Sequence, residues 1–234
     1  GYIKRIFQLF YIRKFDGIYI FLHVVPFTNI IIEKLFVKLA KKTIYDIDDL
    51  VFLLKTSDVN WIASYFKSSQ KYFFLMQKAN YVITCTPYLH DIAKKYNTKT
   101  IDISSTVNTN IYYLKNYKQE KKELVLGWSG SYSTGPYLKL IEEIIQYVIP
   151  KYNLKLLVIG AQKKYIKGIE CELISWKAET EIEDLQRIDI GLYPLPNEKW
   201  VYGKSGLKAI QFMALGIPVV ATAIGTNFRV IDHN

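Results

Sequence analysis

The chain has few of the residues that sustain disulfide, thiol or metal chemistry. Its 234 residues include two cysteines and three histidines. Cys85 and Cys171 each lie in an apolar stretch, which favours a reduced, cytoplasmic protein over one stabilised by disulfides. The histidines lack the spacing of metal ligands. These scarcities argue against a disulfide scaffold, a histidine metal site and a Cys–His enzyme.

Long apolar runs are also missing. The longest, Gly17–Phe27, is interrupted by His23 and Pro26, and it is shorter than the roughly 20 residues that span a bilayer. The N-terminus begins like a signal peptide, but Arg13 and Lys14 end its apolar run. No small-residue cleavage site follows them. We therefore expect neither a transmembrane helix nor a signal peptide.

Acidic residues are scarce in the first half of the chain. Residues 1–117 contain 16 Lys and Arg against 8 Asp and Glu, whereas residues 118–234 contain 15 against 13. A basic half suits membrane headgroups, nucleic acid or a phosphorylated substrate, and it also suits a plain solvated lysine-rich face. Because no zinc finger or RNA-binding aromatic motif is present, we expect no nucleic-acid partner.

Strand-like and helix-like segments alternate along the whole chain. We expect strands at Gly17–Val24, Thr43–Ile47, Tyr81–Cys85, Lys99–Ile103, Glu123–Trp128, Leu154–Ile159, Glu170–Ile174, Ile188–Tyr193 and Ile217–Ala221. We expect helices at Tyr2–Phe15, Ile30–Lys41, Trp61–Lys78, Leu89–Tyr96, Pro136–Val148, Thr180–Arg187 and Ser205–Leu215. Such alternation predicts an α/β fold with parallel strands and helices on both faces of each sheet.

The polar segment Asn108–Lys122 separates two such alternations. We interpret it as a linker between two Rossmann-like domains, residues 1–112 and 113–234. Ligands bind at the carboxyl ends of parallel strands, so a central cleft that both sheets face is the expected site. In the helix predicted at Pro136–Val148, the residues Ile141, Ile144, Ile145 and Val148 follow the i, i+3, i+4, i+7 pattern of one buried stripe.

The loop Gly127–Gly135 follows the first strand of the second half. Its glycines do not have the GxGxxG spacing of a dinucleotide site. The loop can still offer N–H groups and hydroxyls to a phosphate at the next helix, or it is an ordinary flexible loop. Gly203-Lys204-Ser205 resembles half of a P-loop, but Glu198 stands where the first glycine would be, which excludes a P-loop NTPase.

Three polar residues are predicted to share one helix face. Lys204, Lys208 and Gln211 are spaced i, i+4 and i+7. A lysine at a helix start is disfavoured by roughly 0.3–1 kcal/mol, because that end of the helix dipole is already positive. A bound diphosphate would reverse the sign. The alternative is a pair of ordinary surface lysines.

Asp46, Asp48 and Asp49 lie at the carboxyl end of a predicted strand. They could hold a sugar hydroxyl or transfer a proton. Asp46 and Asp48 also have the DxD spacing of a divalent-metal site, and all three could be turn or helix-cap residues. His23, at another strand end, is either a minor catalytic candidate or a core or surface histidine.

The second half resembles the nucleotide-binding domain of GT-B glycosyltransferases, in particular glycosyltransferase family 4. The resemblance lies in LVLGWSGSYSTGPYL, IDIGLYPLP and GKSGLKAIQFMALGIPVVATAIGTN, and more loosely in TIYDIDDLVF of the first half. It implies a GT-B-like fold and a retaining transfer of a hexose-type sugar from a nucleotide-sugar donor, with no cofactor and no essential metal. The chain is short at both ends for this family, so an incomplete N-terminal domain is expected.

The resemblance also implies where the substrates bind. The donor diphosphate would lie against Gly130–Ser131 and the helix start, the ribose near Gln211, and the base near Trp176. The acceptor would approach Asp46, Asp48 and Asp49, the expected catalytic side. The expected donor-binding residues are Gly130, Ser131, Trp176, Lys204, Ser205, Gly206, Lys208 and Gln211.

The chain departs from the family at two places. The family carries a pair of glutamates eight residues apart where this chain has Gly203 and Gln211. It also carries a basic pair in the loop that here reads Ser129–Thr134, without Lys or Arg. Lys204 and Lys208 would then supply the positive charge.

The expected function is a cytoplasmic glycosyltransferase that acts on a glycan or lipid-linked acceptor in polysaccharide or glycoconjugate biosynthesis. Its basic half suits peripheral contact with an anionic membrane, at the inner face of the cell membrane. Three alternatives stay open: a GT-B-fold sugar-nucleotide epimerase, a non-catalytic nucleotide- or glycan-binding module, and a metal-dependent transferase that uses Asp46 and Asp48.

Overall fold

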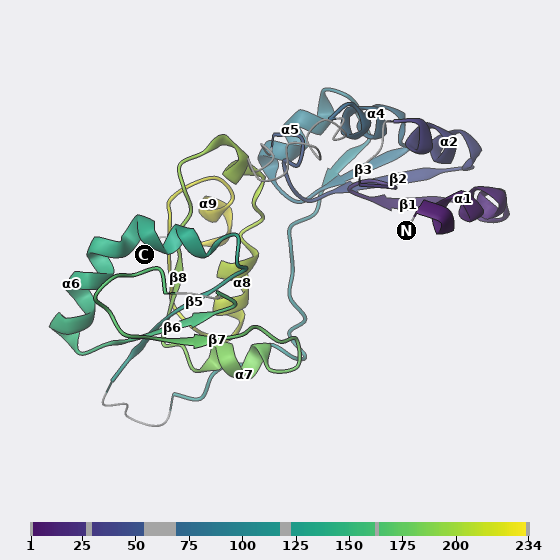
Figure 1. The fold of residues 1–234 in the computed structure, drawn as a ribbon. Helices are drawn as coiled ribbons and strands as arrows, with labels where there is room; N and C mark the ends of the chain where they lie inside the picture. The colour runs from purple at the N-terminus through teal and green to yellow at the C-terminus, as the bar shows by residue number, and fades with distance from the viewer. Residues whose placement is uncertain (1, 27–29, 54–68, 118–122, 162–163, 233–234) are drawn as a thin grey trace. The chain divides into compact units, whose positions relative to one another are not determined.

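A computed structural model describes residues 2–26, 30–53, 69–117, 123–161 and 164–232 of the chain. It divides into two units (Figure 1). The first comprises Gly1–Ser104 with Tyr202–Ser205, and the second comprises Ser105–Val201 with Gly206–Asn234. The boundary expected after residue 112 falls inside the second unit, so Tyr112 belongs with the second sheet.

The first unit is built on a four-stranded parallel sheet with strand order β1-β2-β3-β4. Its strands are β1 (Ile18–Phe21), β2 (Thr43–Ile47), β3 (Tyr81–Thr84) and β4 (Thr100–Asp102). Its helices are α1 (Tyr2–Tyr11), the short 3₁₀ helix η1 (Ile12–Lys14), α2 (Ile31–Leu39), α4 (Gln70–Lys78) and α5 (Pro87–Lys94). Of the helix predicted at Trp61–Lys78, residues 61–68 lie outside the described residues.

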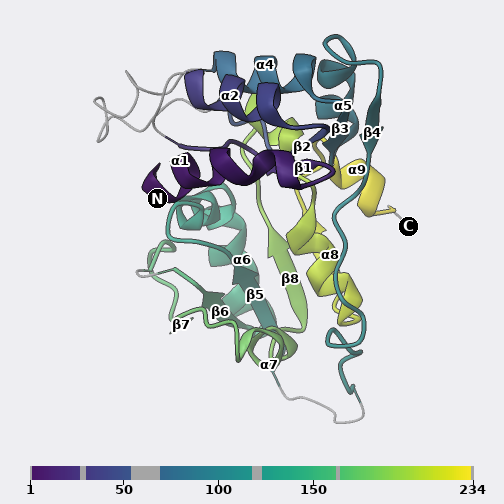
Figure 2. The ribbon, with the colours of Figure 1, turned by 90° about the vertical axis from the view of Figure 1, so that its right-hand side faces the viewer.

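One face of this sheet forms the core of the first unit. Ile20, Tyr45 and Val82 occupy neighbouring positions on β1, β2 and β3, and all three are buried. Buried residues of η1, α2, α4 and α5 belong to the same hydrophobic cluster. Figures 1 and 2 show α2 and α4 together on one side of the strands. The described helices that pack on the sheet therefore contribute to a single layer.

The opposite face of the first sheet is exposed. Tyr19, Ile44 and Tyr81 form its neighbouring row, and they are 58%, 37% and 52% exposed. Helix α1 instead places Leu9 against the core cluster that contains Ile20, Tyr45 and Val82. The prediction of helices on both faces is therefore wrong for the described part of this unit, although purely parallel sheets are normally covered on both faces.

The second unit holds a five-stranded parallel sheet with strand order β7-β6-β5-β8-β9. Its strands are β5 (Val125–Ser129), β6 (Lys155–Ile159), β7 (Cys171–Ile174), β8 (Ile190–Tyr193) and β9 (Val219–Ala221). Its helices are η3 (Gly135–Ile141), α6 (Glu142–Tyr152), α7 (Glu181–Gln186), α8 (Leu207–Ala214) and α9 (Asn227–Val230), and the short 3₁₀ helix η4 (Lys199–Gly203) begins in this unit and ends in the segment 202–205 of the first. The chain proceeds outward from β5 in one direction and then from β8 in the other, so the order reverses between these two strands.

Helices cover both faces of the second sheet. Figures 1 and 2 show α6 and α8 on opposite sides of it. Consecutive residues of β6 point to opposite faces, so Leu156 joins the cluster that includes Ile145 of α6. Its neighbour Leu157 joins the cluster that includes Phe212 of α8. The two parallel sheets confirm the α/β prediction, and this unit confirms helices on both faces.

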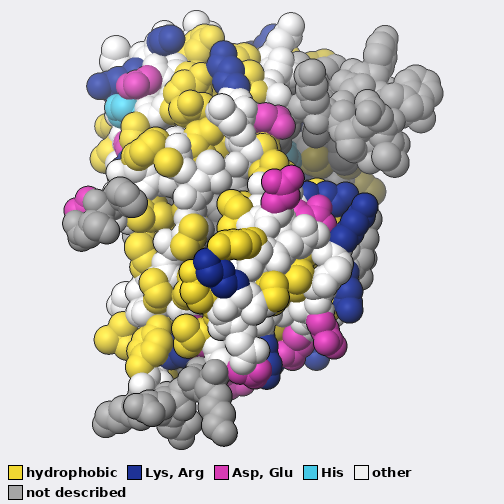
Figure 3. Space-filling model, turned by 90° about the vertical axis from the view of Figure 1, so that its left-hand side faces the viewer, with side chains coloured by type: hydrophobic (Ala, Val, Ile, Leu, Met, Phe, Trp, Pro, Cys, Tyr) yellow, Lys and Arg dark blue, Asp and Glu magenta, His cyan; other side chains and the backbone are white. Residues whose placement is uncertain are grey.

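The helix predicted at Pro136–Val148 is two helices. The 3₁₀ helix η3 ends at Ile141, and the α-helix α6 begins at Glu142. Three of the four residues of the expected stripe still pack in one hydrophobic cluster, namely Ile141, Ile145 and Val148. Ile145 is buried, but Ile144 is 60% exposed. Hydrophobic side chains lie at the surface on the side of the molecule shown in Figure 3.

Candidate functional site

The carboxyl ends of β5, β6 and β7 come close together through two glycines. The N–H of Gly130 donates to the carbonyl of Ile159, and the N–H of Gly160 donates to that of Ile174. A Cβ on Gly160 would lie 2.0 Å from the carbonyl oxygen of Gly130 and 3.5 Å from Cβ of Trp176. The loops that follow the three strands therefore pack against one another, with Trp176 beside them.

The loop after β5 satisfies many of its own polar groups. The N–H of Ser131 donates to Oγ1 of Thr134 at 3.0 Å, and the hydroxyls of Ser131 and Ser133 lie 2.9 Å apart. The helix that follows is the 3₁₀ helix η3 rather than an α-helix. Ser129, at the end of β5, is 3% exposed, and its Oγ has no hydrogen-bond partner among the described residues. Phosphate binding at Gly130 and Ser131 stays a prediction.

A hydrogen-bonded group of side chains lies around the carboxylate of Glu181, at the start of α7. Trp176 donates from Nε1 to Glu181 Oε1 at 3.0 Å, and the Tyr112 hydroxyl donates to Oε2 at 3.0 Å. Gln211 Nε2 lies 3.3 Å from Oε1 and 2.5 Å from the Tyr112 oxygen. Lys208 Nζ lies 3.6 Å from Oε1. We call these five residues the Glu181 cluster.

The cluster joins elements that are far apart in the sequence. Tyr112 lies in the segment before β5, and Trp176 lies between β7 and α7. Lys208 and Gln211 are three residues apart on α8 and therefore lie on one face of that helix. Gln211 is 6% exposed, and its Oε1 has no hydrogen-bond partner in the described part of the chain. The cluster thus combines a satisfied carboxylate with one unsatisfied acceptor.

The charges in the cluster stabilise each other. Burial alone would raise the pKa of Glu181, but the hydrogen bond from Trp176 and the charge of Lys208 outweigh it, so the pKa is lowered. Burial lowers the pKa of the Lys208 ammonium, against the opposing effect of Glu181. Burial also raises the pKa of the Tyr112 hydroxyl. Glu181 is therefore held as a carboxylate that accepts hydrogen bonds.

Lys204 does not belong to this group. Helix α8 begins at Leu207, and Gly206 caps it in the left-handed conformation with φ at 76°. Lys204 therefore lies three residues before the helix and not on the face of Lys208 and Gln211, so the expectation of one shared face is wrong for this residue. The turn at Gly206 interrupts the helical periodicity, so the residues before it do not continue the face of Lys208 and Gln211.

Lys204 instead pairs with an aspartate of the first unit. Its Nζ lies 2.6 Å from Asp49 Oδ2. The Tyr19 hydroxyl donates to Asp46, and this hydrogen bond raises the pKa of Tyr19 to about 12. Burial, reinforced by Asp49, raises the pKa of Asp48. The three aspartates thus have different environments: Asp46 accepts a phenol, Asp49 accepts an ammonium, and Asp48 is the exposed one of the three.

Metal binding by the aspartates is one of the open alternatives. Within the described ranges, no group of three or more His, Cys, Asp or Glu side chains is placed to hold a metal ion. Ser205 follows Lys204 in the same short segment of the first unit. The roles expected for Asp46, Asp48, Asp49 and Ser205 stay predictions.

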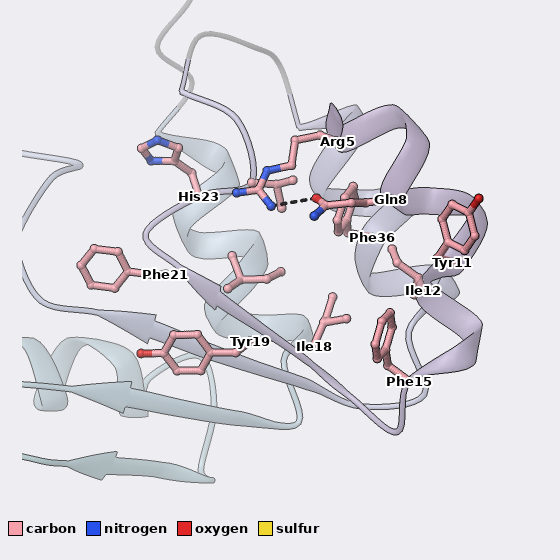
Figure 4. A pocket seen from close by; sticks show the side chains of 12 residues that line it. Arg5, Gln8, Tyr11, Ile12, Phe15, Ile18, Tyr19, Phe21, His23 and Phe36 are labelled. Carbon is pink, nitrogen blue, oxygen red and sulfur yellow. Dashed lines mark hydrogen bonds between the residues drawn. The ribbon is translucent and has the colours of Figure 1, made fainter. Parts of the chain in front are cut away.

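A cavity of about 660 Å³ lies beside β1 in the first unit (Figure 4). Its lining includes Arg5 and Gln8 of α1, Tyr19 and Phe21 of β1, and His23. Arg5 Nη1 donates to Gln8 Oε1 at 2.8 Å, and both side chains come from α1 (Figure 4). Asp46, Asp48 and Asp49 are not among its lining residues, but the lining residue Tyr19 donates a hydrogen bond to Asp46. His23 lines the cavity and stays a minor candidate.

Comparison with known proteins gives a match for the second unit. Residues 123–234 match the family model for group 1 glycosyl transferases. This match covers slightly less than half of the chain, and it includes all five strands of the second sheet. A comparison with curated proteins gives no match.

Several solved structures share the fold. A glycosyltransferase from Rickettsia africae is 14% identical in sequence to this chain, with a TM-score of 0.65. The aligned part covers 99% of this chain and 64% of the Rickettsia chain. A mutant of S. aureus TarM in complex with Fondaparinux, alpha-GlcNAc-glycerol and UDP is 20% identical, with a TM-score of 0.57. Its aligned part covers 82% of this chain and 39% of the TarM chain. An alpha-glucosyltransferase in complex with UDP is 7% identical, with a TM-score of 0.61. Its aligned part covers 93% of this chain and 64% of the glucosyltransferase chain. The chain therefore has a GT-B-like α/β fold and spans about two fifths to two thirds of the length of these structures.

No helix among the described residues combines the length and apolar character needed to span a bilayer.

Proposed function

We propose that this chain is a glycosyltransferase that binds a nucleotide-sugar donor at the carboxyl ends of the strands of its second unit. The observation that carries the proposal is the match of residues 123–234 to group 1 glycosyl transferases. It coincides with a parallel sheet whose strand order reverses next to β5, and such a reversal is where ligands bind in open α/β sheets. The UDP in the similar TarM and alpha-glucosyltransferase structures supports a nucleotide donor.

The donor is proposed to lie across the loop after β5 and the Glu181 cluster. The diphosphate would contact Gly130, Ser131 and Gly206, with Lys204, Ser205 and Lys208 as further donor contacts. Trp176 is 49% exposed, and its indole would stack on the base. The ribose would lie near Gln211, whose unsatisfied Oε1 is an acceptor for a hydroxyl.

The proposed reaction is a transfer with retention at the sugar carbon. The bond from this carbon to the donor phosphate oxygen breaks, and a bond to the acceptor hydroxyl oxygen forms on the same face. The acceptor proton passes to the departing phosphate oxygen, so no protein nucleophile is required. The residues of this chain would position the donor and stabilise the charge of the leaving diphosphate. The transferred sugar is proposed to be a hexose, and no cofactor or metal takes part.

The acceptor is proposed to be a glycan or lipid-linked molecule of polysaccharide or glycoconjugate biosynthesis. It would approach the acidic segment that contains Asp46, Asp48 and Asp49. The basic composition of residues 1–117 supports peripheral contact with an anionic membrane. The proposed location is the cytoplasm, at the inner face of the cell membrane.

A thermal-shift panel tests the donor proposal. The chain is heated with UDP, GDP, ADP, CMP and their sugar conjugates, each with and without Mg²⁺. A ligand at 100 times its Kd stabilises the folded state by about 2.7 kcal/mol. We expect one nucleoside diphosphate to raise the unfolding midpoint independently of Mg²⁺. A midpoint that no nucleotide raises would refute the proposed donor site in this chain, and a shift that requires Mg²⁺ would favour a metal-dependent transferase.

A further inference from the structure

We infer that Glu181 is a positioning residue, which holds the indole of Trp176 and the ammonium of Lys208 in the orientation that a nucleotide ligand requires. This inference rests on the proposed nucleotide site of the second unit. It adds a residue outside the expected donor contacts, one that acts through its neighbours and not by touching the reacting atoms.

The first argument is the number and origin of the contacts. Trp176 donates to one carboxylate oxygen of Glu181, and Tyr112 donates to the other. Because the two oxygens are held by side chains from different elements, the plane of the carboxylate is fixed. Gln211 donates to the same carboxylate and to the Tyr112 oxygen. Glu181 thus connects the loop after β7, the segment before β5 and helix α8.

The second argument concerns Trp176. Its side chain is 49% exposed, yet the polar edge of its indole is bonded to Glu181. An exposed aromatic side chain that is free to rotate loses conformational freedom when a ligand stacks on it. The bond to Glu181 removes part of that freedom before binding. Glu181 thereby prepares a flat surface for a planar ligand such as a nucleobase.

The third argument concerns Lys208. Its ammonium lies 3.6 Å from Glu181 Oε1, and the two side chains are only 26% and 18% exposed. Burial disfavours the charged form of a lysine, and Glu181 opposes that effect. Without the carboxylate, Lys208 would lose the partner that opposes the effect of burial and that holds its ammonium at this site.

The fourth argument is the unsatisfied amide oxygen of Gln211. A buried acceptor without a partner costs free energy unless a ligand or water supplies a donor. Gln211 Oε1 is such an acceptor, and its own Nε2 is held by Tyr112 and Glu181. The orientation of this amide therefore also depends on Glu181, and it leaves one buried acceptor in the cluster.

The test compares matched variants of the full chain. Glu181→Gln keeps the size of the side chain and removes its charge, whereas Trp176→Phe removes the indole N–H and keeps Glu181. The control is Glu183→Gln on the same helix α7, because Glu183 is exposed and two residues away. UDP binding is measured by titration calorimetry. Acrylamide quenching of tryptophan fluorescence is measured without nucleotide.

We expect Glu181→Gln to weaken UDP binding by about tenfold or more, since a charge-assisted hydrogen bond and an ion pair are lost. Quenching should increase in this variant, and the increase should vanish when Trp176→Phe is also present. Glu183→Gln should match the wild type in both measurements. The double variant should bind UDP no more weakly than the weaker single variant, because both changes break the same contact.

Each other outcome has a defined meaning. UDP affinity that is unchanged in Glu181→Gln overturns the inference, and so does unchanged quenching. If Glu181→Gln does not fold, the UDP affinity of Trp176→Phe decides, because this variant breaks the same hydrogen bond and keeps an aromatic ring; an unchanged affinity then overturns the inference. If the wild-type chain binds no nucleotide of the panel, the proposed function is refuted and the ligand role of Glu181 with it. In that case an increase in quenching would still show that Glu181 fixes Trp176, which separates the two failures.

Discussion

A buried ion pair in the second unit offers the sharpest test of the packing. Lys115 Nζ lies 2.6 Å from Asp189 Oδ1, and both side chains are 6% exposed. Lys115 also donates to the carbonyl of Ile188, and the other oxygen of Asp189 accepts from the N–H of Val125. The pair ties the segment that carries Tyr112 to the beginnings of β5 and β8.

The proposed change is Asp189→Asn, which keeps the shape of the side chain but removes the negative charge that lies 2.6 Å from the buried ammonium of Lys115. Removing one member of a buried pair costs about 3–5 kcal/mol, because the remaining charge has lost its compensation. For a chain of this length, that corresponds to a drop of about 6–20 °C in the unfolding midpoint. Urea unfolding followed by tryptophan fluorescence measures the free-energy change.

A double variant and a control make the prediction sharper. Lys115→Met combined with Asp189→Asn should be more stable than Asp189→Asn alone, because the uncompensated charge is gone. The control is Glu123→Gln, which breaks the pair of Glu123 with Lys155 in the same unit. Those side chains are 36% and 65% exposed, so the change should stay within about 1 kcal/mol. The reasoning fails if Asp189→Asn costs no more than this control.

Four further predictions follow from single sites. The pKa of Glu181 is lowered in the folded state, so its contribution to the free energy of unfolding is fully present above the unfolded pKa of about 4.3 and is lost as the pH falls through the folded value. The difference in stability between wild type and Glu181→Gln should therefore shrink below about pH 4, as urea unfolding at several pH values would show. Gly130→Ala should cost about 1–3 kcal/mol in urea unfolding, since its Cβ would lie 2.4 Å from the Trp128 ring, and an unchanged midpoint would contradict that geometry. Burial raises the pKa of the Cys85 thiol to about 12, so this thiol should not react with a disulfide reagent at pH 8 until the chain unfolds, as thiol titration of the Cys171→Ala variant would show. Asp48→Asn should leave nucleotide affinity unchanged and lower sugar transfer in a radiolabel assay, and weakened donor binding would assign this residue to the donor instead.

The sheets could be predicted from the sequence because each strand is a short apolar run between turn residues. The strand Thr43–Ile47 agrees with its prediction at both ends, and β6 begins one residue after the predicted start. Helix ends were less predictable, because they depend on local backbone conformation. Gly206 in the left-handed conformation delays α8 to Leu207, and periodicity does not reveal such a turn.

Coverage of the sheets could not be predicted from alternation alone. The same order of strands and helices gives two helical layers in the second unit and one packed face in the described part of the first. The difference appears in single residues, since Tyr81 is 52% exposed on β3 while Leu157 is 2% exposed on β6. Both are apolar strand residues, and only the placement of the helices distinguishes them.

The Glu181 cluster was missed because its contacts have no local spacing. Glu181 is 69 residues from Tyr112, 30 from Gln211 and 5 from Trp176. An acidic residue in the first turn of a helix is common for electrostatic reasons, so nothing in the sequence singled it out. Trp176, Lys208 and Gln211 were expected from the resemblance, but their connection through one carboxylate required the fold.

That connection changes how the departures from the family pattern are understood. Where the family carries two glutamates, this chain has Gly203 and Gln211. A side chain at Gly203 is excluded sterically, because its Cβ would lie 2.6 Å from Cγ of Leu50. At Gln211 the amide lies 3.3 Å from Glu181 Oε1, so a carboxylate is present beside this position and comes from α7 instead of α8. The absence of a glutamate at position 211 therefore does not remove negative charge from this part of the unit. A second carboxylate placed there would face Glu181 directly, and two such charges in a half-buried site repel each other, which gives a physical reason for glutamine at this position.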